Sequence, residues 1–251
     1  MSLRDRDRLI WIGLVTAWVL WWVRYPISSN WKWKLLSWLL VIVIGAVFSN
    51  ILGRRSVRLF RMAVAAEDVP TARREHANLV DFGRRGRAAE TVKAYHVNIL
   101  LLEEKYQEAL NELRALNLDK LAKKSAPMVQ SQIAYCHMQL GDPEKGLQIA
   151  QSALTGMENM GPDYALSGHA VVGIGHFLLG RSSEAVPHLE RAYAGSAHLP
   201  GIRASSAFYL GESLSALGRR EEAKEAYQRA QGALPNSRDG MRATERLRAT
   251  S

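Results

Sequence analysis

The sequence predicts an all-α protein in two parts, a two-helix transmembrane hairpin in residues 1–52 and an α-solenoid in residues 53–235. Two long apolar runs near the N-terminus predict the hairpin, because each approaches the length that crosses a bilayer. A six-residue phrase that recurs every 37 to 39 positions predicts the solenoid, because a fixed period of this size is typical of stacked helical repeats. The polar segment 236–251 is expected to form a C-terminal capping helix.

The first apolar run, Leu9–Val23, is extended by Tyr25–Ile27 and predicts a span over 9–27. The second predicted span, 35–52, contains no charged residue. A membrane helix needs about 20 mostly apolar residues. Residues 26–30 would form the turn, and the tryptophans of an interfacial belt surround it: Trp21, Trp22, Trp31, Trp33 and Trp38. A signal peptide is the alternative for the first run, but no small-x-small cleavage site follows it.

Basic residues flank the two spans unequally. Seven lie outside the hairpin (Arg4, Arg6, Arg8, Arg54, Arg55, Arg58 and Arg61), and three lie near its turn (Arg24, Lys32 and Lys34). The positive-inside rule then predicts a multi-pass protein of the bacterial inner membrane with both termini and the solenoid in the cytoplasm. A single cysteine, Cys136, agrees with a reducing compartment.

The net charge of +9 is concentrated beside the predicted membrane. Residues 1–90 hold 15 Lys and Arg against 7 Asp and Glu, whereas residues 91–251 hold 18 against 17. This distribution argues against nucleic acid as a partner, since that would require a basic stripe along the solenoid. It favours anionic lipid headgroups, which we expect to contact Arg54, Arg55, Arg58 and Arg61.

Small residues within the spans predict where helices approach closely. Gly13 and Ala17 share one helix face, as do Gly45 and Ser49, and such pairs could seat the spans on each other or on a partner. No Gly, Ser or Pro-rich linker follows the second span. We therefore expect that span to continue into the first helix of the solenoid.

Each repeated phrase lies between two segments with apolar residues at helical spacing. The phrases begin at Glu67, Glu104, Gly141, Gly180 and Gly218 and end at Ala72, Ala109, Gly146, Ala185 and Ala223. The glycines suit the left-handed residue that ends a helix, and Asp142-Pro143 suits the start of the next one. One copy is thus a helical hairpin that must stack on its neighbours to bury its apolar face.

These residues resemble the tetratricopeptide repeat (TPR) family over about 53–235. The final copy supplies Leu210-Gly211, Gly218, Ala223, Tyr227, Ala230 and Pro235 in the family's register, and the earlier copies supply progressively fewer of these positions. The resemblance implies a concave groove lined by the first helix of each repeat: Asn98, Leu101, Ser131, Tyr135, Met138, Ile174, Phe177, Phe208 and Glu212. For Phe177 and Phe208, the alternative is a position in the core between repeats.

The apolar character of this predicted groove suits an extended apolar peptide or an amphipathic helix as partner. A carboxylate-gripping groove of this family would carry Lys and Arg at several of these positions, and here only Asn98 matches. Seven histidines are present, but no metal-binding spacing or nucleophile motif accompanies them. We therefore expect no metal, no cofactor and no enzymatic activity, with His169, His176 and Cys136 as packing residues.

The sequence is compatible with three functions. The first is a membrane-anchored scaffold or adaptor that positions a protein partner at the membrane. The second is a fixed structural subunit of a larger membrane complex. The third follows from architecture, because two closely spaced spans followed by TPR helices resemble the HemY type of bacterial membrane protein, which implies a link to haem biosynthesis.

Overall fold

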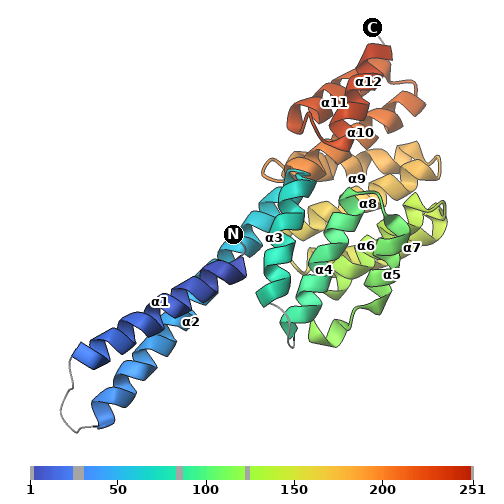
Figure 1. Cartoon of the computed structure of the whole chain (residues 1–251). Helices are drawn as coiled ribbons and strands as arrows, with labels where there is room; N and C mark the ends of the chain where they lie inside the picture. Colours follow the sequence, from blue (N-terminus) through green and yellow to red (C-terminus); the bar gives the residue numbers. More distant parts are fainter. Residues whose placement is uncertain (1–2, 25–30, 83–86, 122–124, 250–251) are drawn as a thin grey trace.

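The computed structural model describes residues 3–24, 31–82, 87–121 and 125–249. The described residues form twelve α-helices and one 3-10 helix. The helices α1 (Leu3–Arg24) and α2 (Trp31–Ala65) form an extended pair that projects from a stack of helical hairpins (Figure 1). The predicted all-α class and the TPR-like solenoid are both confirmed. The predicted turn over 26–30 lies outside the described residues.

Five helical hairpins build the solenoid, as the period predicts. The C-terminal part of α2 pairs with α3 (Val69–Phe82), and four further pairs follow: α4 (Arg87–Leu102) with α5 (Tyr106–Ala115), α6 (Ala126–Gln139) with α7 (Pro143–Glu158), α8 (Pro162–Leu178) with α9 (Ser182–Gly195), and α10 (Pro200–Ala216) with α11 (Arg220–Ala233). A 3-10 turn, Leu118–Lys120, lies between the second and third repeats. The helix α12 (Arg238–Ala249) ends the chain.

The five phrases all form the same turn, including the two that lack glycine. Glu67 and Glu104 have φ values of 53° and 59°, and Gly141, Gly180 and Gly218 have φ values of 89°, 72° and 76°. A non-glycine residue in this left-handed region is uncommon and strained. The first two copies are therefore true repeats, although the sequence there departs furthest from the family pattern.

Small residues let the two helices of a repeat approach each other. A methyl group added to Gly211 of α10 would lie 2.5 Å from the ring of Tyr227 on α11, and one added to Gly173 would lie 2.6 Å from Leu189. Tyr227 and Leu189 are buried. The Leu210-Gly211 pair of the family pattern thus has a packing reason, since only glycine leaves room for the facing side chain.

The helix α2 belongs to both parts of the molecule. Its 35 residues continue without a break from the apolar run into the first repeat, as predicted. At its C-terminal end Phe60 is 1% exposed and packs with Leu79 and Ile99, and Ser56 donates a 2.9 Å hydrogen bond to Glu75 of α3. At about 1.5 Å per residue, α2 is on the order of 50 Å long. The solenoid is therefore attached to a rigid rod.

The helix α1 runs back along the apolar half of α2, and the N-terminal end of α1 reaches α3 (Figure 1). The indole of Trp18 donates to Ser37 at 2.9 Å, and its ring lies 4.5 Å from the ring of Trp38. Trp11 lies directly on Gly45, where any side chain would collide with it. Gly45 is thus a packing position between the two helices.

The other predicted packing residues are placed differently. Gly13 has nothing within 4 Å, and Gly13 and Ala17 are both exposed, so they do not seat α1 on α2. The contact surface of α1 instead passes through Trp11 and Trp18, whose bulk places the small residues on the outer face. The side chain of Ser49 lies outside the described residues.

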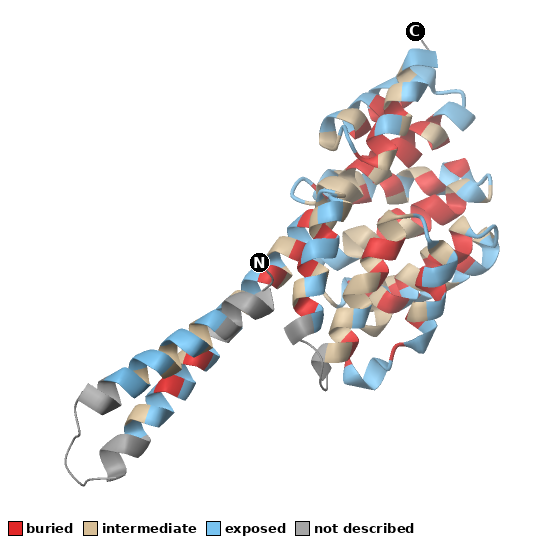
Figure 2. Ribbon diagram, in the orientation of Figure 1, coloured by how far each residue is buried: buried red, intermediate tan, exposed pale blue. Residues whose placement is uncertain are grey.

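Exposure separates the hairpin from the solenoid (Figure 2). Apolar side chains of α1 and α2 that the structure describes are largely exposed, among them Leu9, Ile12, Leu39, Leu40, Ile42 and Ile51. One helical segment of the described residues, Leu36–Ala65, is long and apolar enough to cross a membrane, and Leu9–Leu20 is a shorter apolar helix. The second predicted span therefore meets the length requirement and the first does not meet it alone.

The capping helix forms as predicted, but it is less exposed than its polar sequence suggests. Asp239, Gly240 and Ala243 of α12 are buried against the last repeat. Arg238, the first residue of α12, also reaches back to the first three repeats, bonding with Glu67, Tyr106 and Tyr135. The end of the solenoid is thus joined to its beginning, and the superhelix closes on itself.

Candidate partner-binding cavity

The concave side of the superhelix holds a cavity of about 330 Å³ that is partly open to solvent. Its walls come from the first helices of the second to fifth repeats, α4, α6, α8 and α10, with Glu67 in the turn after α2, Met157 of α7 and the start of α12 completing them. This volume lies at the lower end of the range of about 300–1,000 Å³ that is usual for ligand sites. The space suits a short segment of a ligand.

The side walls of the cavity are mainly apolar. They include Leu101, Met157, Val171, Ile174 and Ile202, with the hydroxyls of Ser131, Ser167 and Ser205 between them. On α4 and α6, Asn98 and Gln132 form an amide pair, in which the Gln132 side chain donates to Asn98 at 3.1 Å. Such a lining binds apolar side chains while offering a few polar groups to a peptide backbone.

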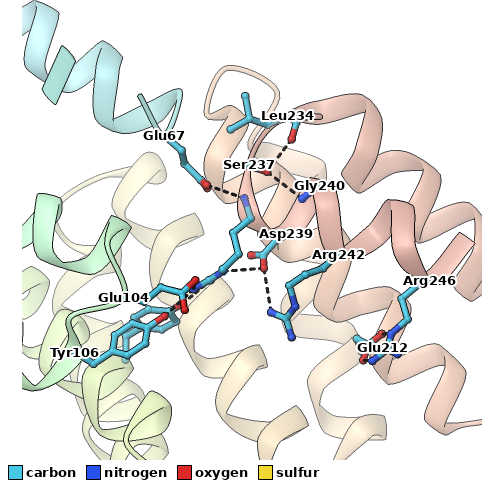
Figure 3. A network of polar contacts seen from close by, with 12 residues as sticks. Glu67, Glu104, Tyr106, Glu212, Leu234, Ser237, Asp239, Gly240, Arg242 and Arg246 are labelled. Carbon is cyan, nitrogen blue, oxygen red and sulfur yellow. Dashed lines mark hydrogen bonds and ion pairs between the residues drawn. The ribbon is translucent and has the colours of Figure 1, made fainter. Parts of the chain in front are cut away.

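Charged and aromatic side chains converge at the start of α12 (Figure 3). Arg238 donates from Nη1 to the Tyr106 hydroxyl at 2.7 Å, from Nη2 to the Tyr135 hydroxyl at 2.9 Å, and from Nε to Asp239 at 3.2 Å. Its backbone N–H donates to Glu67 at 3.1 Å. Each group of the guanidinium fork thus has an acceptor, which holds the side chain in one geometry.

Burial sets the protonation of this network. It raises the pKa of the Tyr135 and Tyr106 hydroxyls, so both stay neutral and accept from Arg238. Burial lowers the pKa of Arg238, but Tyr135 and Asp239 outweigh it and raise that pKa above its usual value. Burial also raises the pKa of Glu67, and the nearby Asp239 charge adds to the rise.

The cavity brings together five of the nine predicted groove residues: Asn98, Leu101, Ser131, Tyr135 and Ile174. The other four lie outside its lining. Met138 is 4% exposed and packs against Gly146 and Gly175, and the half-buried Phe177 packs against Tyr209 with ring centroids 5.6 Å apart. These two residues fill the space between repeats, so the core alternative describes them better than the groove does.

Phe208 and Glu212 are covered by α12, which the repeat pattern does not predict. Arg242 lies over the Phe208 ring, 4.4 Å from its centroid, and Phe208 is 1% exposed. Arg246 donates to both Glu212 oxygens at 2.7 and 2.8 Å, and Tyr227 donates to Glu212 at 2.6 Å. The groove face of the last repeat is therefore occupied by the chain itself.

Sequence reasoning missed Glu67, Gly201, Arg238 and Asp239, which all line the cavity. The first two are turn or helix-start residues, and the last two begin a segment that the pattern assigns to a polar cap. One signal was present, because charged residues at the start of a capping helix often form ion pairs or hydrogen bonds. The partners of Arg238 are 103 to 171 positions away, however, and could not be named from the sequence.

The four predicted headgroup arginines, Arg54, Arg55, Arg58 and Arg61, are exposed on α2 directly after the apolar stretch. Arg54 contacts Asn50 one turn earlier at 2.9 Å. Their position fits an interfacial role. Cys136 is fully buried and burial raises its pKa to about 11, which fits a packing residue.

Histidines gather between α8 and α9 without forming a metal centre. The Nδ1 atoms of His169 and His188 lie 2.9 Å apart, and the His176 and His188 rings stack at 5.8 Å. Across the described residues, no three His, Cys, Asp or Glu side chains are arranged to hold a metal ion. Burial lowers the pKa of all three histidines.

Comparison with known proteins supports the repeat assignment. The family model described as tetratricopeptide repeat matches residues 205–237, which span most of α10, all of α11 and the turn after it. No curated protein matches the sequence significantly. The last hairpin is thus a TPR by sequence, and the four hairpins before it share its fold.

A solved structure shares this fold. The structure of Bacillus thuringiensis PlcR, in complex with the peptide PapR7 and DNA, is similar with a TM-score of 0.62 at 15% identity, over 78% of this chain and 73% of that one. Two structures of nearly identical TPR-like repeats from Podosopora anserina give TM-scores of 0.44 and 0.42 at 17% identity, over 73% of this chain and 92% and 93% of theirs. The likeness to PlcR shows a shared fold.

Proposed function

We propose that this protein is a non-enzymatic, membrane-anchored TPR scaffold that binds a peptide segment of a protein partner in its central cavity and positions that partner at the bacterial inner membrane. The observation that carries the proposal is the cavity itself, which has apolar walls, a few hydroxyl and amide groups, and a position on the concave side of the repeats. PlcR, of the same fold, was solved with a bound peptide, which supports a peptide ligand for this chain.

The membrane part of the proposal depends on α1 and α2. The exposed apolar side chains of α2 lead directly into an exposed basic stretch, the order expected where a helix leaves a bilayer. In the proposed arrangement α1 and α2 cross as a hairpin, with Trp18 and Trp38 packed between them. Both termini and the solenoid then lie in the cytoplasm, with the four arginines at the anionic headgroups.

Substitutions in the cavity test the partner-binding part. Affinity capture of full-length protein from membranes is compared for the wild type, Ile174→Glu and Ser205→Glu, both in the cavity lining. Leu178→Glu is the matched control, because Leu178 is exposed on the same helix as Ile174 and outside that lining. We expect one set of partners that is lost with both cavity variants and kept with the control.

The Ser205→Glu variant is included because Ile174→Glu could misfold: Ile174 is only 3% exposed and burying a charge there is costly, whereas Ser205 is half-buried. Circular dichroism and thermal melting show whether each variant stays folded. Unchanged capture by two folded cavity variants would move the interface elsewhere on the molecule.

Orientation has its own test. In Arg248→Cys, an exposed thiol is added near the end of α12, while the natural Cys136 is buried and contributes little labelling. A membrane-impermeant maleimide applied to intact spheroplasts should leave the variant unlabelled and should label it after lysis. Labelling of intact spheroplasts would place the solenoid outside the cytoplasm.

A second function has one specific observation in its favour. Gly13 and Ala17 present an open small-residue face on the outside of α1, where the helix of another membrane subunit could pack closely. The protein would then be a fixed subunit of a larger membrane complex. Gly13→Leu should in that case dissociate the complex in mild detergent, while a monodisperse wild-type monomer purified at native expression would count against this function.

A further inference from the structure

We propose that the cavity recognises the free amino terminus of a peptide, with the ammonium group bound at Glu67 and the first apolar side chain against the wall formed by Val171, Ile174 and Ile202. This inference rests on the proposed function and specifies its ligand. It follows from three features at the α2 end of the cavity: the charge of Glu67, the space left by Gly201 and the closure of the ring.

The charge of Glu67 is less compensated than that of its acidic neighbours. Asp239 contacts Arg238 at 3.2 Å and Arg242 at 3.3 Å, and Glu104 contacts Arg238 at 3.7 Å. Among the described contacts, the Glu67 carboxylate receives the backbone N–H of Arg238 at 3.1 Å and no side-chain ion pair. A cation in the cavity would therefore find its partner at Glu67.

Gly201 leaves the approach to Glu67 open. A methyl group at this position would lie 3.3 Å from the carbonyl oxygen of Ala65 and 3.9 Å from Oε1 of Glu67. Two acceptors, the Glu67 carboxylate and the Ala65 main-chain carbonyl, thus both lie near Gly201. An ammonium group carries three donors and suits such a pair of acceptors.

The end of α2 adds to the attraction for a cation. Ala65 is the last residue of α2, and its carbonyl is one of the four at a helix end that have no amide partner within the helix; the turn after α2 supplies amide partners to the other three. These carbonyls carry the negative end of the helix dipole, which favours positive charge nearby. The same end of the cavity disfavours an anion, because three of the five N–H groups of Arg238 already donate to Asp239, Tyr106 and Tyr135, and the carboxylates of Asp239 and Glu104 lie 3.2 and 3.7 Å from its guanidinium.

The closed ring selects a chain end over a passing segment. The contacts of Arg238 with Glu67, Tyr106 and Tyr135 join the cap to the first three repeats, so the cap interrupts the concave surface that a partner chain would otherwise follow. The cavity of about 330 Å³ then admits one end of a peptide. Of the two chain ends, the amino terminus matches the charge of Glu67.

Peptide libraries against the full-length protein in detergent test this directly. Three pools of amidated pentapeptides are compared by affinity selection and mass spectrometry: leucine first with a free amino terminus, the same pool acetylated, and an acetylated pool with lysine first and leucine second. We expect enrichment from the first pool, and titration of its best members should show at least tenfold weaker binding after acetylation.

The matched variants are Glu67→Gln and Glu108→Gln, which remove the same charge. Glutamine at 67 still accepts the N–H of Arg238, so the ring contact stays while the charge is lost, and we expect at least tenfold weaker binding. Glu108 is exposed on α5 and outside the cavity lining, so its variant should bind as the wild type does. Gly201→Ala keeps every charge, fills the approach to Glu67 and should weaken binding as well.

Each other outcome overturns the inference in a recognisable way. Equal binding of the acetylated lysine pool would assign the ammonium to a side chain. Peptide binding that is lost with Ile174→Glu but unaffected by acetylation and Glu67→Gln would leave the proposed function standing and remove the amino terminus as its ligand. Failure of every pool, together with partner capture that ignores Ile174→Glu, would remove both.

Discussion

The last two repeats carry equivalent positions with different surroundings. Ala170 and Ile174 of the fourth repeat line the cavity, whereas Phe208 and Glu212, at the same register in the last repeat, lie beneath α12. The helix α12 makes the difference, because it places Arg242 and Arg246 over positions that line the cavity one repeat earlier. A register position therefore predicts which way a residue points, and the neighbouring segment decides whether a ligand can reach it.

The largest loss of stability should come from a substitution of Phe208, which lies in the last repeat beneath α12. Phe208→Ala removes a ring that is 1% exposed and packs against Tyr209 and Tyr227. We expect the free energy of unfolding to fall by about 3–5 kcal/mol, the usual cost of emptying a buried aromatic site. Denaturant unfolding in detergent measures it. Phe177→Ala is the control, because Phe177 of the fourth repeat is half-buried and its removal should lower the free energy of unfolding clearly less. Equal losses would contradict the contrast between the two repeats.

A smaller effect is expected at Arg238, whose contacts with Glu67, Tyr106 and Tyr135 form a latch between the cap and the first three repeats. Arg238→Ala removes the hydrogen bonds to Tyr106 and Tyr135 and leaves the buried Asp239 with Arg242 alone. Since charge-assisted hydrogen bonds contribute about 1.5–3 kcal/mol, we expect a loss of about 2–3 kcal/mol. Hydrogen exchange should accelerate at the start of α12. Arg248→Ala, on the exposed face of α12, should change stability by less than about 0.5 kcal/mol; an Arg238 variant as stable as this control would mean that the ring is not held by the latch.

The smallest effect is pH-dependent and lies at Glu212. Burial raises the pKa of Glu212, but hydrogen bonds from Arg246 and Tyr227 outweigh it and bring that pKa below its usual value. A depressed carboxyl pKa stabilises the fold above the unfolded-state pKa of about 4.3, and this stabilisation is lost as the pH falls through the folded-state pKa. Between pH 7 and about pH 3, the wild type should thus lose about 1 kcal/mol more stability than Glu212→Gln. Parallel thermal melts of the two proteins at both pH values check the sign.

Sequence periodicity predicted most of the fold, because each repeat carries its own local signals. The five left-handed turns lie at the five phrase starts, and the continuous helix α2 follows from the missing linker. The outward placement of Gly13 could not be predicted in the same way. Gly13 and Gly45 have similar neighbours in sequence, and only the position of Trp11 on the opposing helix decides which glycine is covered.

The cavity was predicted in part, for a related reason. Asn98, Ser131 and Ile174 face inward because their repeat positions do. Arg238 and Glu67, which close the cavity, are 171 positions apart and belong to no shared pattern. Their meeting depends on the accumulated rotation of five hairpins, a quantity that no local signal in the sequence contains.

The bond between the first turn and the cap also has a consequence for how such a chain can evolve. Repeat proteins ordinarily gain and lose units by duplication, since each unit touches only its neighbours. Here an inserted or deleted hairpin would rotate Arg238 away from Glu67, Tyr106 and Tyr135 and would break all three bonds at once. The contacts of Arg238 therefore restrict the number of hairpins that this fold can have.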